Sequence, residues 1–154
     1  MQHKWVVLAD LGSMKAYKVD DNKLNSHPRL ELLDSFENPE VHTKLSQTLS
    51  DQAGRFARGS RGTAAGHEIA SGERHNIELE QRRRWVRQLA ERIQQVLRRG
   101  DVDECWFAAG KEINHQILAE LPPELRAKIT RNVVANLTKI EKQDVLGHFQ
   151  SGAA

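Results

Sequence analysis

The spacing of apolar residues divides this chain into two parts, and that division limits the folds it can adopt. In the first part, Lys4–Asp10, Ser13–Asp20 and residues 30–36 are short apolar or alternating segments, which are typical of β-strands. Only Leu11 and Gly12 separate the first two segments, so a tight hairpin joins them. We therefore expect the chain to begin with an antiparallel meander of three strands.

The second part alternates between helical and strand patterns. The expected order is helix, strand, helix, strand and helix, over residues 76–100, 103–109, 112–121, 131–137 and 141–149. Asn76 is the expected N-cap of the first helix, and Pro122 stops the second. A meander followed by this alternation predicts an α/β fold in which a mixed sheet carries helices on both faces.

A long segment between the two parts shows neither period. Residues 51–76 are expected to form a loop in which glycines interrupt Arg, Ser, Thr, Ala and His. The composition, 38% hydrophobic and 29% charged residues, is that of a globular protein. We therefore expect a single domain over residues 1–154 that contains this loop. Loops of such length in compact domains are usually functional or disordered.

Positive charge is concentrated in the loop and in the helix that follows it. The whole chain carries a net charge of +2. Residues 55–99 contain eleven arginines and no lysine against five glutamates and no aspartate, a net charge of +6, so the remainder carries −4. A positive field confined to one stretch favours an anionic partner there.

The loop arginines are the first candidate binding residues. Arg55, Arg58 and Arg61 follow one another at intervals of three. Guanidinium groups bind phosphate oxygens through paired hydrogen bonds and stack on bases. Glycines let the backbone approach a ligand closely, so the candidate backbone contacts of the loop are Gly54, Gly59 and Gly62. The alternative is that the loop is polar only because it is exposed.

The helix after the loop supplies a second candidate row. Two of its arginines follow a glutamate by four residues, the spacing of a helical ion pair. The expected pairs are Glu78 with Arg82 and Glu80 with Arg84. Arg83 and Arg87 have no such partner, so we take them as candidate phosphate contacts.

Residues that could carry catalysis give an incomplete set. Asp10, at the end of the first strand, is suited to be the first metal ligand of a nuclease, but no second carboxylate stands at a matching strand end. The seven histidines show no HxH, HExxH or Cys/His spacing, so no metal site is expected. Cys105, Trp85 and Trp106 are expected in the core. Phosphate-binding glycine motifs are absent, so no cofactor is expected.

The single cysteine also bears on the cellular compartment, because one thiol cannot form an internal disulfide. The first apolar run is too short for a signal peptide, and no stretch approaches the ~20 apolar residues of a membrane helix. These features predict a cytoplasmic protein without a membrane partner.

Three short segments carry a family resemblance. Residues 5–10 (WVVLAD), 50–56 (SDQAGRF) and 106–110 (WFAAG) together resemble the bacterial host attachment protein family, and the resemblance covers nearly the whole chain. That family is similar to the middle domain of archaeal and eukaryotic peptide-chain release factors and of Pelota. The resemblance therefore implies a ribonuclease-H-like fold.

The release-factor likeness also implies a role for the loop and the helix. In release factors, the loop carries a Gly-Gly-Gln tripeptide that enters the peptidyl-transferase centre, and a basic, RNA-contacting helix follows it. The loop of this chain has no Gly-Gly-Gln, so hydrolysis of peptidyl-tRNA is not implied. The segment 82–87 (RRRWVR) matches the basic helix. We predict a non-enzymatic domain that binds the ribosome or structured RNA.

Two alternatives belong to other functional classes. In one, the chain is a protein-interaction module that acts in attachment to host cells or surfaces, and the loop binds a protein or an acidic polymer. In the other, it is a metal-dependent nuclease with Asp10 as a ligand, which predicts metal-dependent cleavage that Asp10→Asn abolishes.

Overall fold

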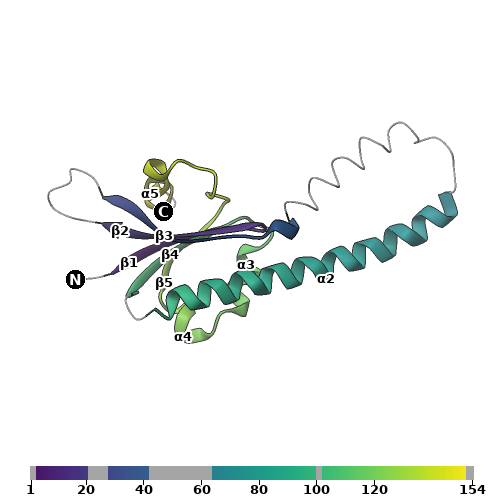
Figure 1. Cartoon of the computed structure of the whole chain (residues 1–154), viewed down its shortest axis with the longest axis horizontal. Coiled ribbons are helices and arrows are strands. Elements are labelled where there is room, and N and C mark those ends of the chain that lie inside the picture. The colour runs from purple at the N-terminus through teal and green to yellow at the C-terminus, as the bar shows by residue number, and fades with distance from the viewer. Residues whose placement is uncertain (1–2, 21–27, 42–63, 100–101, 152–154) are drawn as a thin grey trace.

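Five strands form one mixed sheet in the computed structural model, which describes residues 3–20, 28–41, 64–99 and 102–151 and the side chains among them except those of 64–77 and 151. The strands are β1 (Lys4–Asp10), β2 (Ser13–Asp20), β3 (Arg29–Glu37), β4 (Glu104–Ala109) and β5 (Ile129–Val134). Their order is β3-β2-β1-β4-β5 (Figure 1). The pairs β1/β2 and β2/β3 are antiparallel, and β1/β4 and β4/β5 are parallel. The predicted meander and mixed sheet are confirmed.

The meander begins with the β1/β2 hairpin, whose turn is stabilised by a contact between two of its own residues. The carboxylate of Asp10 accepts a hydrogen bond from the backbone N–H of Gly12 at 2.8 Å, a local contact that favours the turn. On β3 the pairing passes from Tyr17 opposite Leu32 to Ala16 opposite Asp34, which leaves Leu33 without an opposite residue. This β-bulge lies on an edge strand of the sheet, where bulges are common.

Helices cover both faces of the sheet, as the sequence predicts (Figure 1). Helix α2 (Ala64–Leu97) and helix α3 (Asn114–Glu120) lie on one face, and helix α5 (Lys142–Ser151) lies on the other. A single turn, α4 (Pro123–Arg126), joins α3 to β5. The sheet therefore lies between two layers of helix.

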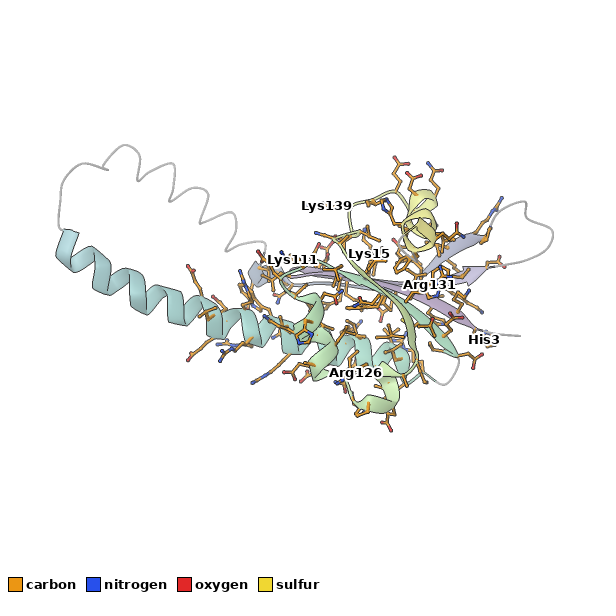
Figure 2. The ribbon with its side chains drawn as sticks, turned by 180° about the vertical axis from the view of Figure 1, so that it is seen from behind. His3, Lys15, Lys111, Arg126, Arg131 and Lys139 are labelled. Atoms are coloured by element: carbon orange, nitrogen blue, oxygen red, sulfur yellow. The ribbon has the colours of Figure 1, made fainter. Side chains whose placement is uncertain are left out.

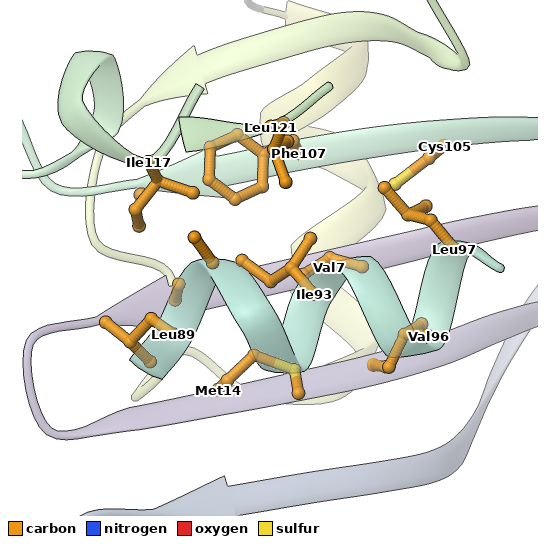
Figure 3. Close-up of a cluster of buried hydrophobic side chains, with 14 of the residues drawn as sticks. Val7, Met14, Leu89, Ile93, Val96, Leu97, Cys105, Phe107, Ile117 and Leu121 are labelled. Carbon is orange, nitrogen blue, oxygen red and sulfur yellow. The ribbon is translucent and has the colours of Figure 1, made fainter. Parts of the chain in front are cut away.

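The larger part of the core lies between the sheet and α2 (Figure 3). Leu89, Ile93 and Leu97 follow one face of α2 and are at most 1% exposed. They pack against strand residues such as Phe107, and Ile117 of α3 closes the cluster. A second, smaller cluster packs the opposite sheet face against α5. The helical period of the apolar residues thus explains why this part of α2 lies on the sheet.

The expected start of this helix is wrong. Helix α2 begins at Ala64, so Asn76 is not its N-cap and residues 64–76 of the predicted loop are helical. Apolar periodicity marks only the part of a helix that packs on a core. The N-terminal half of α2 projects beyond the sheet (Figure 1), so the sheet imposes no apolar period on it.

The last strand also differs from its expected bounds. Strand β5 covers Ile129–Val134 and not residues 131–137, because Pro122 and Pro123 start the single turn α4 and shift the strand toward the N-terminus. Leu137 is 2% exposed and packs in the α5 cluster from the connection that follows β5. An apolar residue in a buried connection has the same sequence signal as one in a strand.

None of the described helices is long and apolar enough to cross a membrane.

Candidate functional site

The predicted loop residues lie outside the part of the chain that the structure describes. They are Arg55, Arg58, Arg61, Gly54, Gly59 and Gly62. The structure describes both ends of the segment that holds them, since β3 leads into a helical turn at residues 39–41 and α2 begins at Ala64. The site is therefore built from α2 and from the contacts at the end of β3.

Helix α2 separates its basic residues from its apolar ones. Arg83, Arg84 and Arg87 are exposed, whereas Trp85 and Val86 between them are buried. Successive helical residues are about 100° apart, so the packing of Trp85 and Val86 turns the neighbouring arginines toward solvent. The two predicted helix candidates, Arg83 and Arg87, are one turn apart on this exposed surface.

Other arginines of α2, and Arg99 just after it, are held by acidic residues elsewhere in the fold. Arg82 lies 3.7 Å from Glu112, which follows β4, and not in the expected pair with Glu78. Asp34 of β3 pairs with both Arg92 (3.1 Å) and Arg99 (3.5 Å). The expected pair of Glu80 with Arg84 is not formed either, although both residues are exposed and described. For Arg82, a residue distant in sequence takes the place of the expected local partner.

These pairings leave one group of arginines unpaired. Among the described side chains, Arg83, Arg84 and Arg87 take part in no hydrogen bond or ion pair. Each guanidinium presents five N–H donors in a planar arrangement. The exposed surface of α2 before Leu89 can therefore bind a polyanion without first breaking a described internal contact.

Side-chain contacts fix the end of β3 against α2. Asn38, 5% exposed, donates from Nδ2 to Oε1 of Gln88 at 3.0 Å, and its Oδ1 accepts the backbone N–H of Glu40 at 3.0 Å. The indole Nε1 of Trp85 donates to the carboxylate of Glu40 at 3.2 Å. The backbone N–H of Asn38 also donates to Gly12 at 2.8 Å. Residues 38–41 therefore lie beside the basic part of α2.

An open groove of about 390 Å³ lies at the same place, between the end of β3 and α2. Phe36, Gln88 and Arg92 line it together with the carboxylates of Glu40 and Glu91. Two carboxylates disfavour a phosphate in this groove. The groove is thus distinct from the unpaired arginine surface.

Asp10, the residue on which the nuclease alternative depends, holds the local structure together. Besides the hydrogen bond from the N–H of Gly12, its carboxylate accepts a hydrogen bond from the hydroxyl of Thr138, with Oγ1 and Oδ2 2.6 Å apart. Thr138 itself is 3% exposed, and its backbone N–H donates to Asn136 at 3.1 Å. Within the described residues, no three His, Cys, Asp or Glu side chains are grouped in a way that could hold a metal ion.

Cys105 and the two tryptophans are core residues, as predicted. Cys105 is fully buried, and burial raises the pKa of its thiol to about 12, so the thiol is protonated at neutral pH. Trp85 and Trp106 are each 6% exposed. The ring of Trp106 lies 4.4 Å from the cationic groups of both Lys4 and Arg131.

Glu104 completes the surroundings of Trp106. Its carboxylate accepts hydrogen bonds from Thr130 (2.5 Å) and from the indole of Trp106 (3.0 Å), and it lies 3.8 Å from Lys4. The bond from Thr130 and, less strongly, the others lower the pKa of Glu104 against the cost of its burial. The charged groups of this cluster contact one another or the ring of Trp106, so the cluster is suited to stabilise the fold.

Sequence reasoning missed the contacts that fix the end of β3. Asn38 followed by Pro39 and Glu40 is a helix-start pattern, an N-cap with proline at the first helical position. That signal indicates the turn at residues 39–41. It does not reveal Gln88 or Trp85, because their contacts depend on how α2 packs.

A comparison with the curated proteins finds no match to the chain. A family model described as a protein required for attachment to host cells matches residues 5–149. The matched part runs from β1 into α5 and so includes all of the sheet except the first residue of β1. The chain therefore belongs to the family of proteins required for attachment to host cells.

Proposed function

We propose that this member of the family is a non-enzymatic domain that binds the ribosome or structured RNA. The observation that carries the proposal is the group of exposed arginines on α2 that have no partner among the described side chains, Arg83, Arg84 and Arg87. They belong to the stretch of residues 55–99, whose net charge is +6. Arginine suits this role because it contacts phosphates in pairs of hydrogen bonds and stacks on bases.

The fold gives independent support. An antiparallel meander followed by two parallel strands, with helices on both faces, agrees with the ribonuclease-H-like fold that the release-factor resemblance implies. Helix α2 contains 34 residues, which corresponds to a length of about 50 Å. Its N-terminal half projects beyond the sheet (Figure 1), so it can enter a recess of a large particle.

The alternatives make different demands on the molecule. A nuclease would need Asp10 for a metal, whereas this carboxylate accepts hydrogen bonds from Gly12 and Thr138. A protein-interaction module in attachment could use the same arginine surface to bind an acidic protein. Such a complex would survive treatment with nuclease, whereas an RNA-bridged one would not.

RNA binding as a function of salt tests the proposal. We expect a fluorescein-labelled RNA hairpin to bind, with an affinity that falls steeply as salt rises. Each phosphate contact contributes about 0.9 to the slope of log affinity against log salt, so five arginines contribute about −4 to −5 to that slope. They are Arg55, Arg58, Arg61, Arg83 and Arg87.

The variant Arg55→Ala/Arg58→Ala/Arg61→Ala should bind more weakly, and its slope should be smaller by about 3. Addition of Mg²⁺ should produce no cleavage of the RNA. Binding that does not respond to salt, or no binding to RNA or ribosomes, would contradict the proposal. Metal-dependent cleavage that Asp10→Asn abolishes would favour the nuclease instead.

A further inference from the structure

A second basic cluster lies away from α2, at the carboxyl ends of the parallel strands. It consists of Lys15 in β2, Lys111 after β4 and Lys139 after β5 (Figure 2). These residues come from three separate parts of the sequence. We refer to them as the edge lysines.

Described contacts bring these three segments together. The ammonium group of Lys15 donates to the backbone carbonyl of Thr138 at 3.0 Å, which places it beside Lys139. A Cβ atom built on Gly110 would lie 4.0 Å from the Cβ of Asn136, so the segment before Lys111 also lies against the connection after β5. Figure 2 shows the three lysines at this one end of the sheet.

The edge lysines are not held in ion pairs with described carboxylates. Lys111 and Lys139 are exposed. Lys15 uses one of its three N–H donors on Thr138. Of the nearby acids, Glu112 pairs with Arg82. Asp10 and Glu141 accept hydrogen bonds from the uncharged groups of Gly12, Thr138 and Gln143, so both keep their negative charge.

The position within the sheet is also one at which ligands bind. In open α/β sheets, ligands commonly lie outside the carboxyl ends of parallel strands, because the connections diverge there. The edge is also joined to α2, since Glu112, the neighbour of Lys111, lies 3.7 Å from Arg82, the neighbour of Arg83. The segment that carries Lys111 therefore lies close to the part of α2 that carries Arg83.

We propose that the edge lysines form a second phosphate-binding site, which contacts the backbone of the same RNA that α2 binds. The inference rests on the proposed function for the identity of the polyanion. Lysine ammonium groups act as point charges on phosphate, so this site adds affinity without base specificity. The arginines of α2 and the edge lysines would hold the RNA at two separated points.

The test compares two double variants that remove equal charge. Lys111→Ala/Lys139→Ala removes two exposed edge lysines and breaks no described contact. The matched control is Lys18→Ala/Arg29→Ala, at the far end of the meander. With the fluorescein-labelled RNA hairpin, we expect the edge variant to lower affinity on the order of tenfold and the salt slope by about 2. The control should leave the slope unchanged.

A second measurement separates the sources of phosphate and does not depend on RNA. Inorganic pyrophosphate should shift the NMR amide signals of Lys111 and Lys139 in the wild type and not in a Lys15→Gln/Lys111→Gln/Lys139→Gln variant that keeps its circular dichroism spectrum. Pyrophosphate shifts in a protein that binds no RNA would contradict the RNA assignment and the proposed function together.

The failure of this inference alone has a different signature. If Arg83→Ala/Arg87→Ala weakens RNA binding but the edge variant behaves like its control, the second site is refuted and the proposed function stands. The absence of both an RNA effect and a pyrophosphate shift would refute any phosphate site at this edge.

Discussion

From Trp85 to Leu97, helix α2 buries an apolar face against the sheet, whereas before Trp85 the same helix extends beyond the sheet (Figure 1). Among the side chains of α2 that the structure describes, all the buried ones lie in the first part. Near the boundary, the arginine surface of Arg83, Arg84 and Arg87 faces solvent with no described partner. One continuous helix thus joins a region that maintains the fold to a region suited to binding. The comparison implies that stability and binding respond to different substitutions.

The largest expected effect is on the packed side of this comparison. Phe107→Ala, under α2, should lower the free energy of unfolding by about 3–5 kcal/mol, because the ring is fully buried and its removal leaves a cavity. Denaturant unfolding measures the change. Leu79→Ala, on the part of α2 where the side chain is 39% exposed, should change stability by less than about 0.5 kcal/mol. Equal losses of unfolding free energy in the two variants would mean that α2 stabilises the fold as much before Trp85 as after it.

The contact between the end of β3 and α2 should give the next largest effect. Asn38→Ala removes a buried amide and leaves Gln88 and the backbone N–H of Glu40 without their partner, so we expect a loss of about 1–2 kcal/mol. Gln88→Ala is the matched control. Because Gln88 is exposed, water can accept the hydrogen bond that Asn38 donates to it in the wild type. An Asn38→Ala variant as stable as the wild type would show that this contact does not hold β3 on α2.

Substitutions on the basic surface are expected to weaken binding and to leave stability nearly unchanged. Arg83→Ala/Arg87→Ala should lower the affinity for the RNA hairpin on the order of tenfold, with a change in unfolding free energy below about 0.5 kcal/mol. Arg92→Ala is the control on the same helix, because Arg92 pairs with Asp34 at 3.1 Å and its loss should reduce stability without reducing affinity. Similar results from the two variants would show that binding and stability are not separated along α2.

The smallest effect concerns pH and the cluster around Trp106. The folded state lowers the pKa of Glu104 below its usual 4.5, so this carboxylate stabilises the fold above that pH and the contribution is lost as pH falls through the lowered value. Glu104→Gln should therefore be less stable than the wild type at neutral pH by at most about 1 kcal/mol, and equally stable in strong acid. Denaturant midpoints across pH measure this. A constant difference at all pH values would mean that the Glu104 charge is not responsible.

The sequence predicted the packed elements well and the projecting ones poorly. The bounds of β1 and β2 agree with the expected ones because alternation and a short turn are local signals. The sequence predicts a helix start at Asn76, whereas α2 begins at Ala64, because apolar periodicity marks only the part of a helix that packs on a core. The exposure of Arg83 and Arg87 followed from the helical period. The pairing of Arg82 with Glu112, and the meeting of Lys15 with Thr138, depend on packing between distant segments and could not be read locally.

Co-sedimentation with ribosomes tests the central claim most directly. The protein should pellet with ribosomes at low salt and be released progressively as salt rises. The variant Arg83→Ala/Arg87→Ala should be released at lower salt than the wild type. Nuclease treatment of the lysate should also abolish its capture of partners. Sedimentation that neither salt nor the double variant changes, or capture of a protein partner that survives nuclease, would contradict the claim that α2 binds RNA.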